Sequence, residues 1–106
     1  MFFEFRHYKI NPGKQADWVK LMEEAIIPFQ TSQGMDIRGS WVGEEDETDY
    51  FWLRGFQDEA ERERLYEAVY ESDTWKNEIG PKVRELIDRE AIQVQRIVPT
   101  PASGIS

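Results

Sequence analysis

DYFWLRGF, residues 49–56, is the stretch that decides how this sequence folds. Five of its eight residues are large and apolar, and the run predicts a buried β-strand. Arg54 lies among them, although a guanidinium is charged at any physiological pH and is costly to bury without a partner. We therefore expect Arg54 either to lie at the end of the strand without a functional role or to face a space in which a ligand or partner binds.

Turn signals and hydrophobic periodicity divide the rest of the chain into strands and helices. The aromatic run at residues 2–10 ends at Asn11-Pro12-Gly13, a strong turn signal, and helical three- and four-residue spacing follows it. An acidic loop separates two further strands, which are predicted to pair as a hairpin. The predicted elements in chain order are strand 2–10, helix 14–31 with Pro28 kinking or ending it, strand 36–43, strand 50–56, a helix capped by Asp58, a helix bearing apolar residues from Trp75 to Ile87, and strand 91–98.

This order of elements predicts an α+β fold of the ferredoxin-like βαββαβ class. Its four-stranded sheet is antiparallel, with both helices on one face and the first and third strands as central neighbours. Residues 1–98 are expected to form a single domain and residues 99–106 a flexible C-terminal tail. No helix remains to cover the second sheet face, which carries aromatic side chains, so we predict a two-fold symmetric homodimer.

The composition argues against several classes of function. The chain has 106 residues and a formal net charge of -8. Nucleic acid and anionic membrane surfaces both require a basic protein face, so we expect neither as a partner. The chain has no cysteine, which excludes disulfides, thiolate metal sites and a cysteine nucleophile. No run is long and apolar enough for a signal peptide or a membrane span, and we expect a cytoplasmic protein.

Strand alternation divides the third strand into two sets of side chains. Tyr50, Trp52 and Arg54 alternate with Phe51 and Leu53. The purely apolar pair suits the core under the helices. We therefore expect the other three side chains to point away from the helices, toward water, a ligand or a partner subunit.

The first strand repeats this pattern. If it pairs with the third strand, Arg6 and Tyr8 join Arg54 on one sheet face. Two guanidinium groups beside aromatic rings suit an anionic or carbonyl-bearing aromatic ligand. The predicted ligand-binding residues are Arg6, Tyr8, Tyr50, Trp52 and Arg54. The alternative for each arginine is an ion pair with Glu4 or with an acid of the partner chain.

Other chemically capable side chains are predicted to have structural roles. His7 is the only histidine, and alternation places it with Phe3 and Phe5, facing the helices. We interpret it as a hydrogen-bonded core residue in preference to a general base or a haem ligand. Tyr66 and Tyr70, one helical turn apart, are interpreted as surface packing in preference to a pocket mouth. No group of residues has the spacing of a zinc or EF-hand site, and we expect neither metal nor cofactor.

An ordered set of short motifs resembles the NIPSNAP family. The run FEFRHYKINPGK at residues 3–14 resembles that family's opening Tyr-Glu-Leu-Arg pattern and its Pro-Gly-Lys turn. FWLRGFQDEAERE at residues 51–63 and YESDTWKNEI at residues 70–79 are similar to its Trp-Leu-Arg strand and its Ser-x-x-Trp segment. The resemblance covers residues 2–98. It departs at residues 3 and 5, where the family often has Tyr and Leu, and at His7, where a small polar residue is common.

The resemblance implies a dimeric α+β barrel. In that superfamily two ferredoxin-like sheets pair, and a cavity lies between each sheet and its own helices or within the barrel. Relatives include cofactor-independent monooxygenases, isomerases and haem-using enzymes, so the family implies a fold more firmly than a function. We expect a small-molecule-binding barrel, with an enzyme of the monooxygenase or isomerase type as its catalytic form. The alternative is a non-catalytic homo-oligomeric module whose interface uses the same residues, and a haem protein is a distant third.

Overall fold

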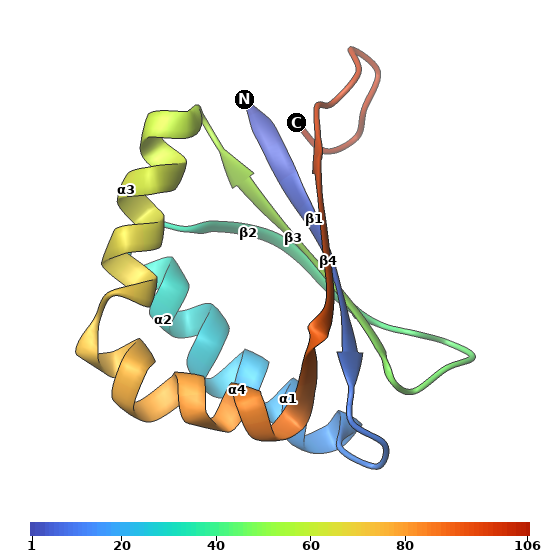
Figure 1. The fold of residues 1–106 in the computed structure, drawn as a ribbon. Helices are drawn as coiled ribbons and strands as arrows, with labels where there is room; N and C mark the ends of the chain where they lie inside the picture. The colour runs from blue at the N-terminus through green and yellow to red at the C-terminus, as the bar shows by residue number, and fades with distance from the viewer.

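The computed structural model, which describes residues 1–106, has the predicted order of strands and helices (Figure 1). Its strands are β1 (Phe2–Ile10), β2 (Asp36–Val42), β3 (Asp49–Phe56) and β4 (Ile87–Ile97). They form one antiparallel sheet in the order β2-β3-β1-β4, so β3 and β1 are the central neighbours. The predicted hairpin and the ferredoxin-like fold class are confirmed.

Helices lie on one side of this sheet (Figure 1). The first helical segment consists of α1 (Gln15–Leu21), the π-helical turn η1 (Met22–Ile26) and α2 (Ile27–Ser32). The second consists of α3 (Glu59–Tyr70), then the π-helical turn η2 (Thr74–Ile79) and α4 (Gly80–Leu86). Asp58 caps α3 as predicted, because its carboxylate accepts from the backbone N–H of Glu61 at 2.8 Å. No helix combines the length and apolar character needed to cross a bilayer.

Each π-helical turn ends two residues before a proline. Pro28 lies in the first turn of α2, just after η1, and Pro81 lies in the first turn of α4, just after η2. A proline ring inside an α-helix clashes with the carbonyl group four residues earlier. In η1 the backbone N–H of Ile27 donates instead to the carbonyl of Met22, five residues earlier, and η2 ends with an equivalent bond. This wider turn relieves the clash, so each helix continues past its proline.

β4 begins four residues earlier than the predicted strand 91–98. Ile87, predicted to lie on a helix, is the first residue of β4. The pairing with β1 then slips, because His7 is opposite Gln93 whereas Lys9 is opposite Asp88. β4 therefore carries extra residues at this point, in the manner of a β-bulge, and bends there.

The structure reverses the predicted faces of the sheet. Tyr8, Tyr50 and Trp52 belong to the main hydrophobic core under the helices. Phe5 and Phe51 lie on the uncovered face, where Phe5 is 37% exposed. The face prediction is wrong because it treated polarity as a sign of exposure. Charged side chains on the covered face pair with one another, whereas large apolar ones remain on the uncovered face.

Candidate functional site

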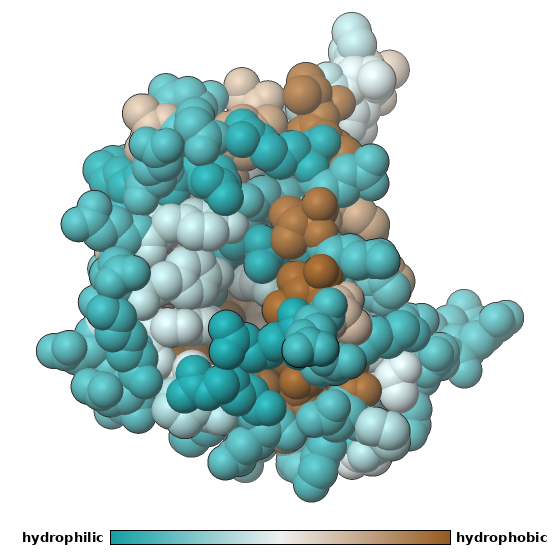
Figure 2. Space-filling view, in the orientation of Figure 1, coloured by the Kyte–Doolittle hydropathy of each residue, from teal (hydrophilic) through white to brown (hydrophobic).

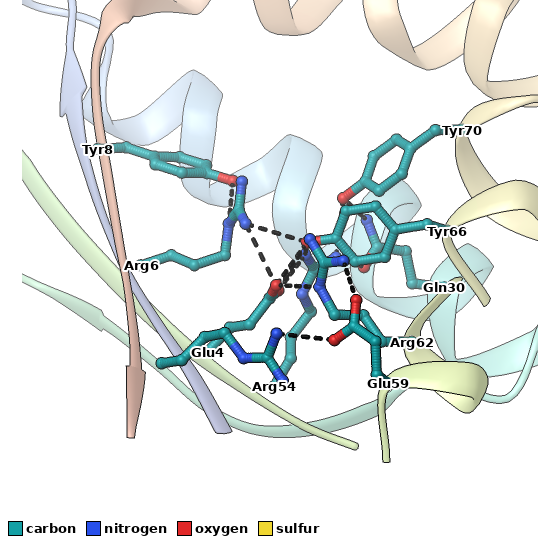
Figure 3. A network of polar contacts seen from close by, with 10 residues as sticks. Glu4, Arg6, Tyr8, Gln30, Arg54, Glu59, Arg62, Tyr66 and Tyr70 are labelled. Carbon is teal, nitrogen blue, oxygen red and sulfur yellow. Dashed lines mark hydrogen bonds and ion pairs between the residues drawn. The ribbon is translucent and has the colours of Figure 1, made fainter. Parts of the chain in front are cut away.

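A network of buried charges and tyrosines lies between the sheet and α3 (Figure 3). Glu4 and Arg54 are direct partners across β1 and β3, and neither side chain is more than 1% exposed. Nη2 of Arg54 donates to Oε1 of Glu4 at 2.8 Å. The ion pair with Glu4, which was the alternative for Arg54, is therefore confirmed.

Arg54 is further held by neutral side chains from both helical segments. Its Nη1 donates to the amide oxygen of Gln30 at 2.9 Å and to the Tyr70 hydroxyl at 2.8 Å. Its Nη2 also donates to the Tyr66 hydroxyl at 2.8 Å, and its guanidinium carbon lies 4.6 Å from the centre of the Trp52 ring. A dimer-interface role is wrong for Arg54, because its own chain covers it completely.

Glu4 is the only carboxylate within this network's buried centre. Nε of Arg62 donates to its Oε2 at 2.9 Å, and the Tyr66 hydroxyl donates to both oxygens at 2.7 and 2.8 Å. Burial alone would raise the pKa of Glu4, but the charge of Arg54 and the hydrogen bonds lower it to about 2. The carboxylate is therefore ionised at neutral pH.

Arg6 is the arginine of this network with the weakest pairing. Its Nε donates to the Tyr8 hydroxyl at 3.0 Å, and its Nη1 makes long contacts to Tyr66 at 3.3 Å and to Glu4 at 3.5 Å. Its Nη2 has no hydrogen-bond partner, and the side chain is 14% exposed. Burial disfavours the charged form of Arg6, but its electrostatic interaction with Tyr8 raises its pKa above the ordinary value.

A cavity of about 180 Å³ lies beside Arg6, between the sheet and the helices. Of the predicted ligand-binding residues, Arg6, Tyr8 and Trp52 line it. The structure does not bring the other two to the cavity. Arg54 belongs to the buried network and does not line the cavity. Tyr50 does not line it either, and its hydroxyl is hydrogen-bonded to the Ser40 hydroxyl at 2.6 Å.

Several residues of this region were not predicted as site residues. Tyr70 and Trp75 line the cavity, and Tyr66 and Tyr70 bond to Arg54, so the interpretation of the two tyrosines as surface packing is wrong. The two tyrosines are one helical turn apart and each follows a residue of the apolar stripe of α3, a pattern that could have indicated that both face the sheet. Arg89 reaches the rim through the slip in β4, which the sequence does not reveal.

The rim of the cavity includes side chains of β4. In Figure 2 brown hydrophobic side chains follow the line of β4, and paler side chains lie between them and the helix layer. Arg89 and Ile92 come from the segment of β4 whose pairing with β1 slips. The bulge thus brings a second guanidinium to the cavity.

His7 lies on the opposite face of the sheet from the cavity. Its Nε2 is 2.8 Å from Oδ1 of Asp49, and its ring stacks on Phe51 with 4.4 Å between ring centres. The predicted hydrogen bond of His7 is present, but its predicted place in the core under the helices is wrong. No three His, Cys, Asp or Glu side chains come together in a way that could hold a metal ion.

Comparison with known proteins identifies one family. The family model described as NIPSNAP matches residues 3–103 of the chain. A NIPSNAP family protein from Agrobacterium tumefaciens has a similar structure, with a TM-score of 0.86 at 23% identity over 99% of this chain and 98% of that chain. An uncharacterized NIPSNAP domain protein from Burkholderia xenovorans gives a TM-score of 0.84 at 19% identity, over 97% and 98% of the two chains.

The similarity of fold extends to an enzyme. An antibiotic biosynthesis monooxygenase gives a TM-score of 0.69 at 13% identity, over 95% of this chain and 100% of that chain. At such low identity the likeness is one of fold alone. No curated protein matches the chain.

Proposed function

The chain belongs to the NIPSNAP family, and from this premise we propose that it binds a small organic anion or carbonyl compound in the cavity between its sheet and its helices. One observation carries the proposal: Arg6 is a charged, largely covered side chain that borders the cavity with its Nη2 unpaired. A guanidinium in such surroundings gains most from an ionised or strongly polar acceptor.

The balance of charge around the network supports an anionic ligand. Arg54 is balanced by Glu4, and Arg62 is also paired with Glu59 at 3.1 Å. Arg6 has only its 3.5 Å contact to Glu4, whose oxygens already accept from the two other arginines. A negatively charged group in the cavity would give Arg6 a partner of its own.

Binding fits the cavity better than catalysis by proton transfer. A general base needs a pKa near the working pH and a position within reach of the substrate. Burial raises the pKa of Tyr8 in spite of the charge of Arg6, and Glu4, with a pKa of about 2, does not line the cavity. His7 lies on the other sheet face. Activity of the cofactor-independent monooxygenase or isomerase type would be established by conversion of a substrate without added metal or flavin.

Native mass spectrometry of the freshly purified protein tests the binding function. We expect a co-purifying small molecule, which should be lost from Arg6→Gln and retained by Arg38→Gln. Arg38 is a matched control because it is an exposed arginine of β2 that pairs with Asp36. Retention of the same molecule by Arg6→Gln would contradict the proposed site.

We also propose that the chain is a homodimer joined through the uncovered sheet face. Phe5 is 37% and Trp41 46% exposed there, and with Phe51 they line a shallow apolar groove. The Trp41 ring lies over Gly39, where a Cβ would collide with it. The space left by the missing side chain of Gly39 is therefore occupied by this ring. An exposed aromatic surface of this kind suits a self-complementary contact between two copies.

A further inference from the structure

The polar side-chain groups around the cavity are mainly hydrogen-bond donors. Arg6 and Arg89 contribute guanidinium groups, and no aspartate or glutamate lines the cavity. Trp18 and Trp52 also line it, and their buried indole N–H groups have no acceptor. Tyr8 accepts from Arg6, which leaves its own hydroxyl proton free to donate. Buried donors without partners are costly, so a molecule that fills this space should bring acceptor atoms.

A carboxylate meets this requirement better than a neutral polar group. It has no donor of its own when ionised, and its two oxygens offer several acceptor sites. Nη2 of Arg6 is a free charged donor at the edge of the cavity, and its guanidinium is held in place by Tyr8 and Tyr66 (Figure 3). The acidic end of the ligand is therefore expected at Arg6.

The size and walls of the cavity limit the rest of the molecule. An apolar cavity of about 150 Å³ is large enough to bind benzene, and this one measures about 180 Å³. That volume accepts one ring with a small substituent. Apart from the two arginines, all the lining side chains are apolar or aromatic.

The wall rings are arranged edge to face. Tyr8 and Trp52 have ring centres 6.0 Å apart at 71°, and Tyr70 and Trp75 have ring centres 4.8 Å apart at 87°. Such an arrangement leaves ring faces and edges available to a further planar ring, which would extend it. A puckered aliphatic ring makes fewer contacts of this kind.

We propose that the cavity binds a single-ring aromatic carboxylate of about the size of benzoate, with its carboxylate at Arg6 and its ring among Trp52, Tyr70 and Trp75. This assignment rests on the binding function proposed above and narrows it to one chemical class. Arg89, an exposed residue without an ion-pair partner, lies at the mouth, where its charge attracts the acid in spite of the negative net charge of the chain.

Isothermal titration calorimetry of the wild-type chain with four probes tests the ligand class. The probes are benzoate, cyclohexanecarboxylate, benzyl alcohol and acetate. Loss of the charged hydrogen bond should weaken binding by at least about tenfold. Loss of the planar ring should weaken it by about two- to tenfold, so benzoate should bind most tightly. Equal binding of cyclohexanecarboxylate overturns the aromatic class, and equal binding of benzyl alcohol overturns the carboxylate.

Two variants locate the probe. Arg6→Gln should weaken benzoate binding by at least about tenfold, because it removes the charge at the acidic end. Ile92→Trp should abolish binding, because Ile92 lines the cavity at its half-buried rim and the larger side chain would fill the space. Arg38→Gln is the control and should bind benzoate as the wild type does. Unchanged benzoate binding by both Arg6→Gln and Ile92→Trp overturns the assignment.

The proposed ligand class and the proposed binding function can be disproved by different results. If benzoate does not bind, but a non-aromatic anion or carbonyl compound binds and is lost in Arg6→Gln, only the aromatic class is wrong. If no small molecule depends on Arg6, both the ligand class and the binding function are wrong. Circular dichroism of each variant verifies that it is folded.

Discussion

The Arg54 guanidinium donates to the Glu4 carboxylate at 2.8 Å across the two central strands, and the same chain buries both side chains completely. Such a pair is stabilised only if its remaining donors and acceptors are also satisfied. Gln30, Tyr66 and Tyr70 provide most of these bonds. The charge in the middle of β3 is therefore held by the sheet and both helical segments together.

Replacement of Arg54 by Met should destabilise the fold strongly. Glu4 keeps its bond from Arg62 but loses its fully buried partner, and two tyrosine hydroxyls and Gln30 lose a donor. We expect the free energy of unfolding to fall by about 3 kcal/mol or more. Urea denaturation followed by circular dichroism measures it.

Two further variants test the origin of that loss. Arg38→Met removes an exposed ion pair and should cost less than about 0.5 kcal/mol. The double variant Glu4→Gln/Arg54→Met should be more stable than Arg54→Met, because it no longer leaves a poorly compensated buried charge. A loss below about 1 kcal/mol in Arg54→Met would show that the pair does not hold the fold.

Stability should depend on acid pH through Glu4. Its pKa is about 2 in the folded chain against 4.5 for an ordinary glutamate, so the folded state binds a proton less readily than the unfolded state. Its contribution is therefore complete above about pH 4.5 and is lost as the pH falls toward about 2. The difference between the folded and unfolded pKa values of Glu4 corresponds to about 3 kcal/mol in the free energy of unfolding. Urea midpoints at a series of pH values across this interval measure it.

Glu4→Gln should flatten this acid dependence, because the group that titrates has been removed. Glu85→Gln, which changes an exposed glutamate without an ion pair, should keep the wild-type slope. An equally steep acid dependence in Glu4→Gln would assign the effect to other carboxylates.

The fold could be predicted from the sequence because local signals agreed with one another. The turn after Ile10, the acidic loop before Asp49 and the cap at Asp58 all lie at element boundaries in the structure. Hydrophobic periodicity then assigned most segments correctly. The exception was Ile87, whose apolar side chain suits either the last turn of a helix or the first residue of a strand.

The side of the sheet on which the site lies could not be predicted in the same way. Alternation correctly placed Arg6, Tyr8 and Arg54 on one face, but it does not say which face the helices cover. The answer depends on partners distant in sequence, such as Gln30 and Tyr66, which make a charged strand face suitable for burial. The polarity of the strand residues therefore predicted the wrong sheet face as the one covered by the helices.

Replacement of His7 by Gln should leave ligand binding intact. His7 lies on the uncovered sheet face, against Phe51 and Asp49, and none of these three side chains lines the cavity. Independent sites of this kind affect each other little, so the benzoate dissociation constant should stay within about twofold of the wild-type value. Calorimetry of His7→Gln beside Arg6→Gln provides the comparison. If His7→Gln weakened benzoate binding as much as Arg6→Gln does, the assignment of the binding site to the cavity face of the sheet would be wrong.

Replacement of Phe5 by Glu should dissociate the proposed dimer. Phe5 lies at the centre of the uncovered face, opposite Leu53 on β3 and Gln95 on β4. Two-fold symmetry places the new carboxylate in the contact twice, so each copy brings a desolvated like charge toward the other. We expect the dimer dissociation constant to rise by about a hundredfold or more. Sedimentation velocity over a range of concentrations measures the change.

Ala60→Glu is the matched control for this variant. It adds the same carboxylate at an exposed position of α3, on the helix side of the molecule. The control should sediment as the wild type does, whereas Phe5→Glu should sediment as a monomer with unchanged secondary structure. A wild-type chain that is monomeric at all concentrations, or a Phe5→Glu dimer as stable as the wild type, would contradict association through the uncovered face. In the second case a dimer would have to form elsewhere, and the edge strands β2 and β4 would be the next surfaces to test.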